Sequence, residues 1–195
     1  MSQNDIKIFF NELAPTWDKR EVKNDNDIIS LLNKCSIKEG DTALDLGCGT
    51  GRISRLLFNI SKRRIYAIDI SNKMIEIAKE KYKNDKDFNF IAGDFLDYKF
   101  DVLFDDIIIY NAYPHFIDKN KLSLALKRNL KENGKVIILH SFSRSELKNI
   151  HRNVSNNISC ELLSPSDEAL YFKDDFDVIK ADEGKGFYIL ILKRK

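Results

Sequence analysis

The sequence predicts an α/β protein with three layers (α/β/α), in which helices cover both faces of a seven-stranded, mostly parallel, doubly wound sheet. Three observations lead to this prediction. Short apolar runs alternate along the chain with segments whose apolar residues recur at helical spacing. A glycine-rich segment, 45–51, joins the first apolar run directly to a helical segment. The last two apolar runs, 177–180 and 187–193, are separated only by a turn at 183–186, so they are expected to form a C-terminal antiparallel hairpin.

The other strands are expected where short runs are mainly apolar or β-branched and are bounded by turn residues. These runs are 42–46, 64–70, 88–92, 104–110 and 135–140. The fourth run contains Ile107, Ile108 and Ile109 in succession, which is typical of a strand buried on both faces. A helical segment separates most of these runs from the next, and parallel strands need such crossover connections.

Helices are expected where apolar residues recur three or four positions apart. These segments are 5–13, 27–33, 50–59, the segment after Ser71, 119–130, 143–151 and 165–172. Local signals set their ends. Pro15 cannot continue the first helix, and the side chains of Ser71 and Asp118 are suited to capping helix N-termini. Pro165 fits the first turn of a helix, whereas the polar segment 152–160 is expected to be a loop.

Length and composition restrict the class of protein. The 195 residues fit one domain, and a hydrophobic share of 43% is enough for a sizeable core. The net charge of +2 gives no sign of the basic surface that nucleic-acid binding usually needs. Three well-separated cysteines form no disulfide or zinc pattern. The N-terminus does not resemble a signal peptide, and no apolar run approaches the ~20 residues that span a bilayer. A cytoplasmic location without membrane attachment is therefore expected.

The segment 45–51, Asp-Leu-Gly-Cys-Gly-Thr-Gly, is the first candidate site. Glycines allow the backbone to turn sharply and approach a ligand, and the helix that follows directs its free N–H groups toward the loop. The spacing is GxGxG rather than the GxGxxG that seats a dinucleotide pyrophosphate, and the acidic Asp45 before it would repel such a group. The residues of this segment expected to contact a cofactor are Asp45, Gly47, Cys48, Gly49 and Gly51.

Two further carboxylates follow the next two predicted strands. Asp69 ends the second strand, about 20 residues beyond the glycine segment, where a carboxylate can accept hydrogen bonds from ribose hydroxyls. Asp94 follows the third strand and can accept a hydrogen bond from an adenine amino group, with Phe95 packed near the ring. The three carboxylates are expected to meet because the carboxyl ends of parallel strands lie at one edge of the sheet.

These segments resemble the three cofactor motifs of class I S-adenosylmethionine-dependent methyltransferases. The resemblance covers residues 40–140 well, and it implies S-adenosylmethionine as the cofactor. That molecule carries an ammonium and a sulfonium but no phosphate, so Asp45 suits its ammonium. By the same resemblance, Gly47 and Gly49 line the methionine end, while Ile70 and Met74 flank the adenosine. Tyr110, at the end of the fourth strand, is also expected at the cofactor.

The acceptor side is expected after the fourth strand, in segment 110–116. DNA N6-adenine and protein-glutamine methyltransferases carry Asn/Asp-Pro-Pro-Tyr/Phe there. This chain has a single offset proline, Pro114, which argues against an amide or an exocyclic amine as the acceptor. The segment looks more like that of small-molecule methyltransferases, and Asn111 and Tyr113 are expected to contact the substrate.

Residues 9–18 also resemble small-molecule enzymes of the quinone-biosynthesis type, in which such a stretch forms a lid. The resemblance implies that residues 1–35 are an N-terminal helical lid segment, residues 36–195 the methyltransferase domain, and Trp17 a substrate contact. Ordinary core packing is the alternative for Trp17, since aromatic side chains mostly bury area.

The three histidines, His115, His140 and His151, are expected to converge near the acceptor. His115 or His140 is the candidate general base, because an imidazole can take a proton near neutral pH, and His151 is a candidate substrate contact. A zinc site and ordinary loop histidines are the alternatives; since the spacing is not diagnostic, no metal is expected.

The predicted function is transfer of a methyl group from S-adenosylmethionine to a small-molecule acceptor whose reacting atom stays open. The alternatives are an RNA or protein methyltransferase, a non-catalytic cofactor-binding protein of the same fold, and, disfavoured by the glycine spacing, a NAD-dependent oxidoreductase. The sequence leaves the oligomeric state undetermined.

Overall fold

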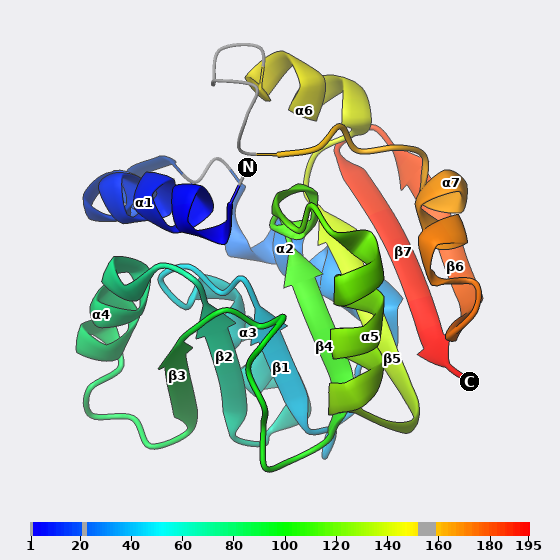
Figure 1. The fold of residues 1–195 in the computed structure, drawn as a ribbon. Coiled ribbons are helices and arrows are strands. Elements are labelled where there is room, and N and C mark those ends of the chain that lie inside the picture. Colours follow the sequence, from blue (N-terminus) through cyan, green and yellow to red (C-terminus); the bar gives the residue numbers. More distant parts are fainter. Residues whose placement is uncertain (1, 21–22, 152–158) are drawn as a thin grey trace.

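The computed structural model describes residues 2–20, 23–151 and 159–195, and it shows a seven-stranded sheet between layers of helices (Figure 1). The strand order is β3-β2-β1-β4-β5-β7-β6. The strands are β1 (Ala43–Leu46), β2 (Ile65–Asp69), β3 (Phe88–Ala92), β4 (Phe104–Tyr110), β5 (Leu130–His140), β6 (Phe176–Gly184) and β7 (Phe187–Arg194). The first five are parallel and β7 is antiparallel to both β5 and β6, so the predicted fold is confirmed.

The helices occupy the positions that the periodicity predicts. The α-helices are α1 (Gln3–Leu13), α2 (Asp25–Leu32), α3 (Arg52–Ser61), α4 (Asn72–Lys81), α5 (Lys119–Asn129), α6 (Arg144–His151) and α7 (Pro165–Ala169). The 3-10 helices are η1 (Ala14–Arg20), η2 (Asn33–Cys35), η3 (Tyr113–His115) and η4 (Leu170–Phe172). Ser71 and Asp118 cap α4 and α5 through their side chains, as predicted. The chain continues beyond Pro15 as a 3-10 turn rather than leaving the helix directly.

Two apolar clusters, one on each face of the sheet, form the core. Ile107 and Ile109 belong to the cluster under α5 and α7, whereas Ile108 belongs to the cluster under α2 and α3. Successive side chains of a strand point to opposite faces, so this apolar triplet joins both halves of the core. Each of the three is fully buried, which contributes about 1.5–3 kcal/mol per side chain.

The strands differ most from the prediction at two places. The strand expected at 135–140 begins at Leu130, where β5 pairs with Phe104 before an irregularity in the register. The hairpin is tighter than expected, because Gly184 pairs with Phe187 and leaves only residues 185–186 to turn the chain. Gly186 has a φ of 77°, a left-handed conformation that suits glycine in a two-residue turn.

The parallel strands end beside one another at the edge of the sheet where α1 and α6 lie (Figure 1). Ligands of doubly wound sheets bind at this edge, beyond the carboxyl ends of the strands. The fold therefore brings the loops after β1 to β5 to a common place beneath the N-terminal segment. In the described part of the chain, no helix has the length and apolar character that crossing a membrane requires.

Candidate functional site

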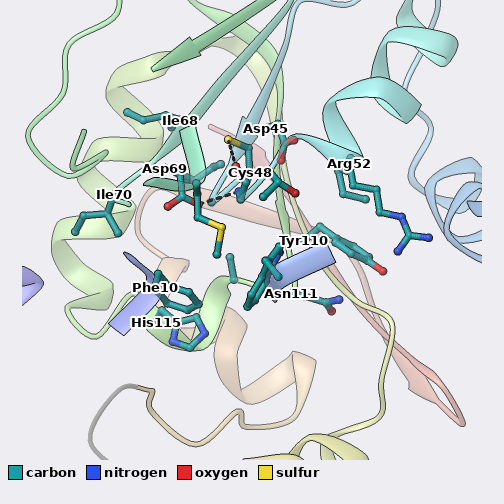
Figure 2. A pocket seen from close by; sticks show the side chains of 18 of the residues that line it. Phe10, Asp45, Cys48, Arg52, Ile68, Asp69, Ile70, Tyr110, Asn111 and His115 are labelled. Atoms are coloured by element: carbon teal, nitrogen blue, oxygen red, sulfur yellow. Dashed lines mark hydrogen bonds between the residues drawn. The ribbon is translucent and has the colours of Figure 1, made fainter. Parts of the chain in front are cut away.

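A cavity of about 440 Å³ lies at the carboxyl ends of the strands, a size typical of small-molecule sites. The loops after β1 to β5 and the N-terminal segment line it. The predicted site residues that line this pocket are Trp17, Asp45, Gly47, Cys48, Gly49, Asp69, Ile70, Met74, Asp94, Phe95, Tyr110, Asn111 and His115. Figure 2 shows Asp69 and Ile70 on one side of the pocket, and Arg52 and Tyr110 on the other.

The glycine segment turns the chain from β1 into α3 beneath the pocket. Gly47 has a φ of 75°, and a Cβ there would lie 2.6 Å from the Cβ of Ala112, which is too close for any side chain. The prediction that Gly51 contacts the cofactor is not supported, since Gly51 does not line the pocket. A Cβ at Gly51 would lie 2.8 Å from the ring of Phe90, so this glycine lets β3 pack against the start of α3.

Asp45 lies at the end of β1 and is 1% exposed. Its Oδ2 accepts a hydrogen bond of 2.6 Å from the Ser54 hydroxyl. The pKa of this carboxyl is raised to about 7: burial is the main cause, the hydrogen bond from Ser54 opposes the rise, and the nearby carboxylate of Asp69 adds to it. A buried carboxylate at the wall of a pocket favours a cationic ligand group, because a cation relieves the cost of its charge.

The next two carboxylates lie along the same edge. Asp69 accepts backbone hydrogen bonds from Gly49 at 2.9 Å and from Ser71 at 2.8 Å, while burial raises its pKa. Asp94 is half-buried and accepts a hydrogen bond of 3.0 Å from the backbone of Leu96, and burial raises its pKa as well. The structure thus brings the three predicted carboxylates together in one cavity.

The N-terminal segment covers the pocket and is attached to it at two points that the sequence did not reveal. Asn11 accepts hydrogen bonds from the Ser71 hydroxyl at 2.7 Å and from the Lys73 backbone at 3.2 Å, at the start of α4. Asp18 accepts a hydrogen bond of 2.6 Å from the Thr50 hydroxyl and pairs with Lys81 at 2.6 Å. Contacts between residues so distant in sequence leave no local signal.

Between these two attachments, Trp17 packs over the glycine segment. A Cβ at Gly49 would lie 3.2 Å from the indole nitrogen of Trp17. Gly49 therefore leaves room for the tryptophan, and both line the pocket. Trp17 was expected either to contact the substrate or to pack in the core. Its position is compatible with both, since the ring packs against the protein and also lines the cavity.

The far side of the pocket is mostly aromatic and apolar. The ring of Phe10 meets the imidazole of His115 edge to face, with centroids 4.8 Å apart (Figure 2). Phe116 and Leu147 also line this side. His115 lines the pocket, as do Phe10 and Leu147, which were not among the predicted site residues.

Asn111 joins the ends of β4 and β5. Its side-chain amide donates to the Ser141 hydroxyl at 3.0 Å, and its carbonyl oxygen accepts from the Ser141 backbone at 3.0 Å. Its φ of 53° is unusual for a residue other than glycine, although Asn tolerates it better than most. The two hydrogen bonds hold this strained residue, and the Asn111–Ser141 pair forms the pocket wall between the strands.

The structure corrects the prediction for Tyr113. Its side chain is fully buried and does not line the pocket. The hydroxyl donates a hydrogen bond of 2.6 Å to Glu168 in α7, and the ring packs near Phe172. Burial raises the pKa of the phenol, and the carboxylate of Glu168 raises it further. The short 3-10 turn after β4 directs this residue into the core beneath α7.

The prediction that three histidines converge is also wrong for His140. This residue is 1% exposed, does not line the pocket, and meets the ring of Tyr188 on β7 with centroids 5.6 Å apart. Neighbouring side chains of a strand alternate in direction, so the next residue, Ser141, reaches the pocket instead. His151 ends α6, and its side chain lies outside the described residues. Among the side chains that the structure describes, no His, Cys, Asp and Glu group of three or more has the arrangement of a metal site.

A family model described as "Methyltransferase domain" matches residues 37–183. The chain is 28% identical over 150 residues to a malonyl-[acyl-carrier protein] O-methyltransferase of Priestia megaterium, covering 75% of this chain and 54% of that protein. It is 36% identical over 101 residues to a demethylmenaquinone methyltransferase of Thermotoga maritima, covering 51% and 43%. The chain thus spans about half the length of the curated relatives it matches.

Among solved structures, the N-methyltransferase NodS from Bradyrhizobium japonicum, in complex with S-adenosyl-L-homocysteine, superposes with a TM-score of 0.72. The alignment covers 97% of this chain and 98% of that one, at 13% identity. This likeness shows a shared fold over the whole length.

Proposed function

The chain belongs to the methyltransferase-domain family, and from this premise we propose that it transfers the methyl group of S-adenosylmethionine to a small-molecule acceptor. The observation that carries the proposal is the meeting of Asp45, Asp69 and Asp94 in one cavity, at the ends of three adjacent strands. The family match confirms the predicted resemblance to class I methyltransferases. The roles of individual residues and the nature of the acceptor are part of the proposal.

The residues present fit this cofactor better than a dinucleotide. The buried carboxylate of Asp45, with its raised pKa, suits an ammonium and would repel a pyrophosphate. Asp69 and Asp94 offer acceptor oxygens for ribose hydroxyls and an adenine amino group, with Ile70, Met74 and Phe95 as apolar neighbours. When bound, the cofactor supplies an electrophilic methyl group on a sulfonium, and the protein supplies position and electrostatics.

The acceptor binds on the aromatic side of the pocket in this proposal. Phe10 and Phe116 exclude water from the reacting atoms, and the Asn111–Ser141 pair fixes the wall beside them. His115 holds the position from which an imidazole takes the proton of an acceptor hydroxyl, thiol or amine. Residues 1–35 form a lid whose attachments, Asn11 and Asp18, must open for ligands to exchange.

The acceptor class rests on two supports. The matched relatives are methyltransferases of malonyl-[acyl-carrier protein] and demethylmenaquinone, neither of which is a nucleic acid. The net charge of +2 also gives little support to an RNA acceptor, because nucleic-acid affinity depends on phosphate neutralisation. The atom that receives the methyl group stays open in this proposal.

Thermal unfolding with S-adenosylhomocysteine or NAD tests the cofactor assignment. A ligand at 100 times its dissociation constant stabilises the native state by about 2.7 kcal/mol, or roughly 5–10 °C for a chain of this size. S-adenosylhomocysteine is expected to give this shift and NAD none. Asp94→Asn should weaken the binding of S-adenosylhomocysteine about tenfold or more, whereas Asp97→Asn, an exposed neighbour that does not line the pocket, is the matched control. Stabilisation by NAD alone would contradict the proposal.

A screen of thiols, phenols, amines and quinols with labelled S-adenosylmethionine tests catalysis itself. Transfer of label to one class identifies the acceptor. If the cofactor binds tightly and no label is transferred across the screen, the protein is better described as a non-catalytic cofactor-binding protein of this fold.

A further inference from the structure

The residues that line the pocket come from the ends of adjacent strands, so each part of the pocket can be assigned to a position along the sheet. Asp94 follows β3, Asp69 and Asp45 lie at the ends of β2 and β1, and the Asn111–Ser141 pair lies after β4 and β5. A cofactor whose adenosine lies at the first two carboxylates and whose ammonium lies at Asp45 leaves the edge beyond β5 for the acceptor. The chemistry of the side chains at that edge therefore indicates which class of acceptor can bind there.

Lys23 lies at the edge beyond β5. Its ammonium is 5.8 Å from the ring centroid of Phe142, which follows β5, and a Cβ on Gly186 would lie 3.4 Å from the same atom. Arg20 lines the pocket as well, and its Nε donates to the Thr16 hydroxyl at 3.2 Å. Two cationic side chains thus line a pocket whose other acceptor-side residues are mainly apolar.

A third cation, Arg52, keeps Lys23 in place rather than offering a free charge. Its guanidinium pairs with Asp25 at 2.8 Å and donates a hydrogen bond of 2.6 Å to the backbone carbonyl of Lys23. Because these contacts use the guanidinium of Arg52, the charges of Lys23 and Arg20 are the ones available to a ligand. Figure 2 shows Arg52 and Tyr110 on the side of the pocket away from Ile70.

Glu146 is close enough to feel the charge of Lys23, but its carboxylate is already hydrogen-bonded to another residue. Glu146 in α6 accepts hydrogen bonds from the backbone and the hydroxyl of Ser143, at 2.7 and 2.6 Å. These hydrogen bonds lower the pKa of Glu146, and the charge of Lys23 lowers it slightly further. Within residues 2–20, 23–151 and 159–195, no carboxylate comes within ion-pair distance of Lys23 or Arg20.

We propose that the acceptor carries an anionic group, a carboxylate or a phosphate, which Lys23 and Arg20 bind while its apolar body packs against Phe10 and Phe142. This inference rests on the proposed function. The carboxylate of the donor is a poor alternative for Lys23, because it shares a carbon atom with the ammonium assigned to Asp45 and so belongs beside β1. Arg20 is exposed and Lys23 is half-buried, and two such cations lining a pocket also attract anions from solution.

Binding of matched probes tests this proposal without knowledge of the true acceptor. Benzoate is compared with benzamide, and phenyl phosphate with phenol, by calorimetric titration into protein saturated with S-adenosylhomocysteine. The anionic member of at least one pair is expected to bind at least tenfold more tightly than its neutral partner. The pair with the larger ratio distinguishes a carboxylate from a phosphate. Arg20→Gln combined with Lys23→Gln should reduce that ratio to within twofold of unity.

Lys19→Gln is the matched control, since Lys19 is exposed on the same segment and does not line the pocket. It should keep the wild-type ratio. Equal affinity for charged and neutral probes in the wild-type protein would overturn the proposal while leaving the proposed function intact. A tenfold loss of S-adenosylhomocysteine affinity in the double variant would also overturn it, because the cations would then hold the donor. Failure of the wild-type protein to bind S-adenosylhomocysteine would instead refute the proposed function.

Discussion

Replacement of Asp45 by Asn should make the protein more stable and less able to bind its cofactor. Burial raises the pKa of Asp45 from 3.8 to about 7. Folding therefore favours the protonated form of Asp45. The contribution of this carboxyl to the unfolding free energy is complete below its unfolded-state pKa of 3.8, and it is lost as the pH rises through its folded-state pKa of about 7. The shift corresponds to about 4 kcal/mol of unfolding free energy as an upper bound, at one pKa unit per 1.36 kcal/mol. Asn carries no charge and can still accept the hydrogen bond from Ser54.

Urea denaturation without ligand, at pH 4, 6 and 8, measures this effect. The stability of Asp45→Asn relative to wild type should increase with pH, by up to about 4 kcal/mol between pH 4 and pH 8, with most of the increase complete by pH 7. Asp101→Asn controls for the loss of a negative charge at the exposed surface. S-adenosylhomocysteine should stabilise the wild-type protein at pH 8 and have little effect on Asp45→Asn. A relative stability that is constant with pH, or one that falls, would refute the reasoning.

Three other substitutions test other parts of the site. Gly49→Ala places a Cβ 3.2 Å from the indole nitrogen of Trp17, so the emission of this single tryptophan should shift and S-adenosylhomocysteine should bind several-fold more weakly; unchanged emission would contradict the packing. Tyr113→Phe removes the hydrogen bond to Glu168 and should lower the unfolding free energy by about 1–3 kcal/mol in urea denaturation. The affinity of this variant for S-adenosylhomocysteine should stay within twofold of wild type, and a large loss of affinity would indicate that Tyr113 belongs to the binding site after all. His115→Gln should lower kcat with an identified acceptor about 100-fold or more while leaving the affinity for S-adenosylhomocysteine unchanged, and undiminished turnover would exclude His115 as the base.

The sequence predicts those parts of the site that depend on local structure. Asp45, Asp69 and Asp94 each lie within two residues of the end of a strand, and parallel strands present their carboxyl ends together. Their meeting in one cavity therefore follows once the strands are recognised. The same reasoning identifies Gly47, whose left-handed conformation belongs to the turn after β1.

Other parts of the site depend on the direction in which a side chain points, or on contacts between residues that are far apart in the sequence. Tyr113 and His140 lie next to pocket residues, and a single step along the backbone directs their side chains into the core instead. Gly51 belongs to the same glycine-rich segment as Gly47 and Gly49. A side chain is excluded at Gly51 by the ring of Phe90, however, which lies 39 positions later in the sequence. The attachments of Asn11 and Asp18 join residues 60 and 32 positions apart, so they become visible only in three dimensions.

The Asn111–Ser141 pair is a part of the pocket that should tolerate substitution poorly, whereas other lining residues should tolerate it well. Two reciprocal hydrogen bonds and a left-handed backbone fix this wall, so substitutions there would disturb both strand ends at once. Phe10, Phe116 and Leu147 come from α1, a loop and α6, outside the sheet. Directed evolution toward new acceptors should therefore yield its productive variants at these three positions.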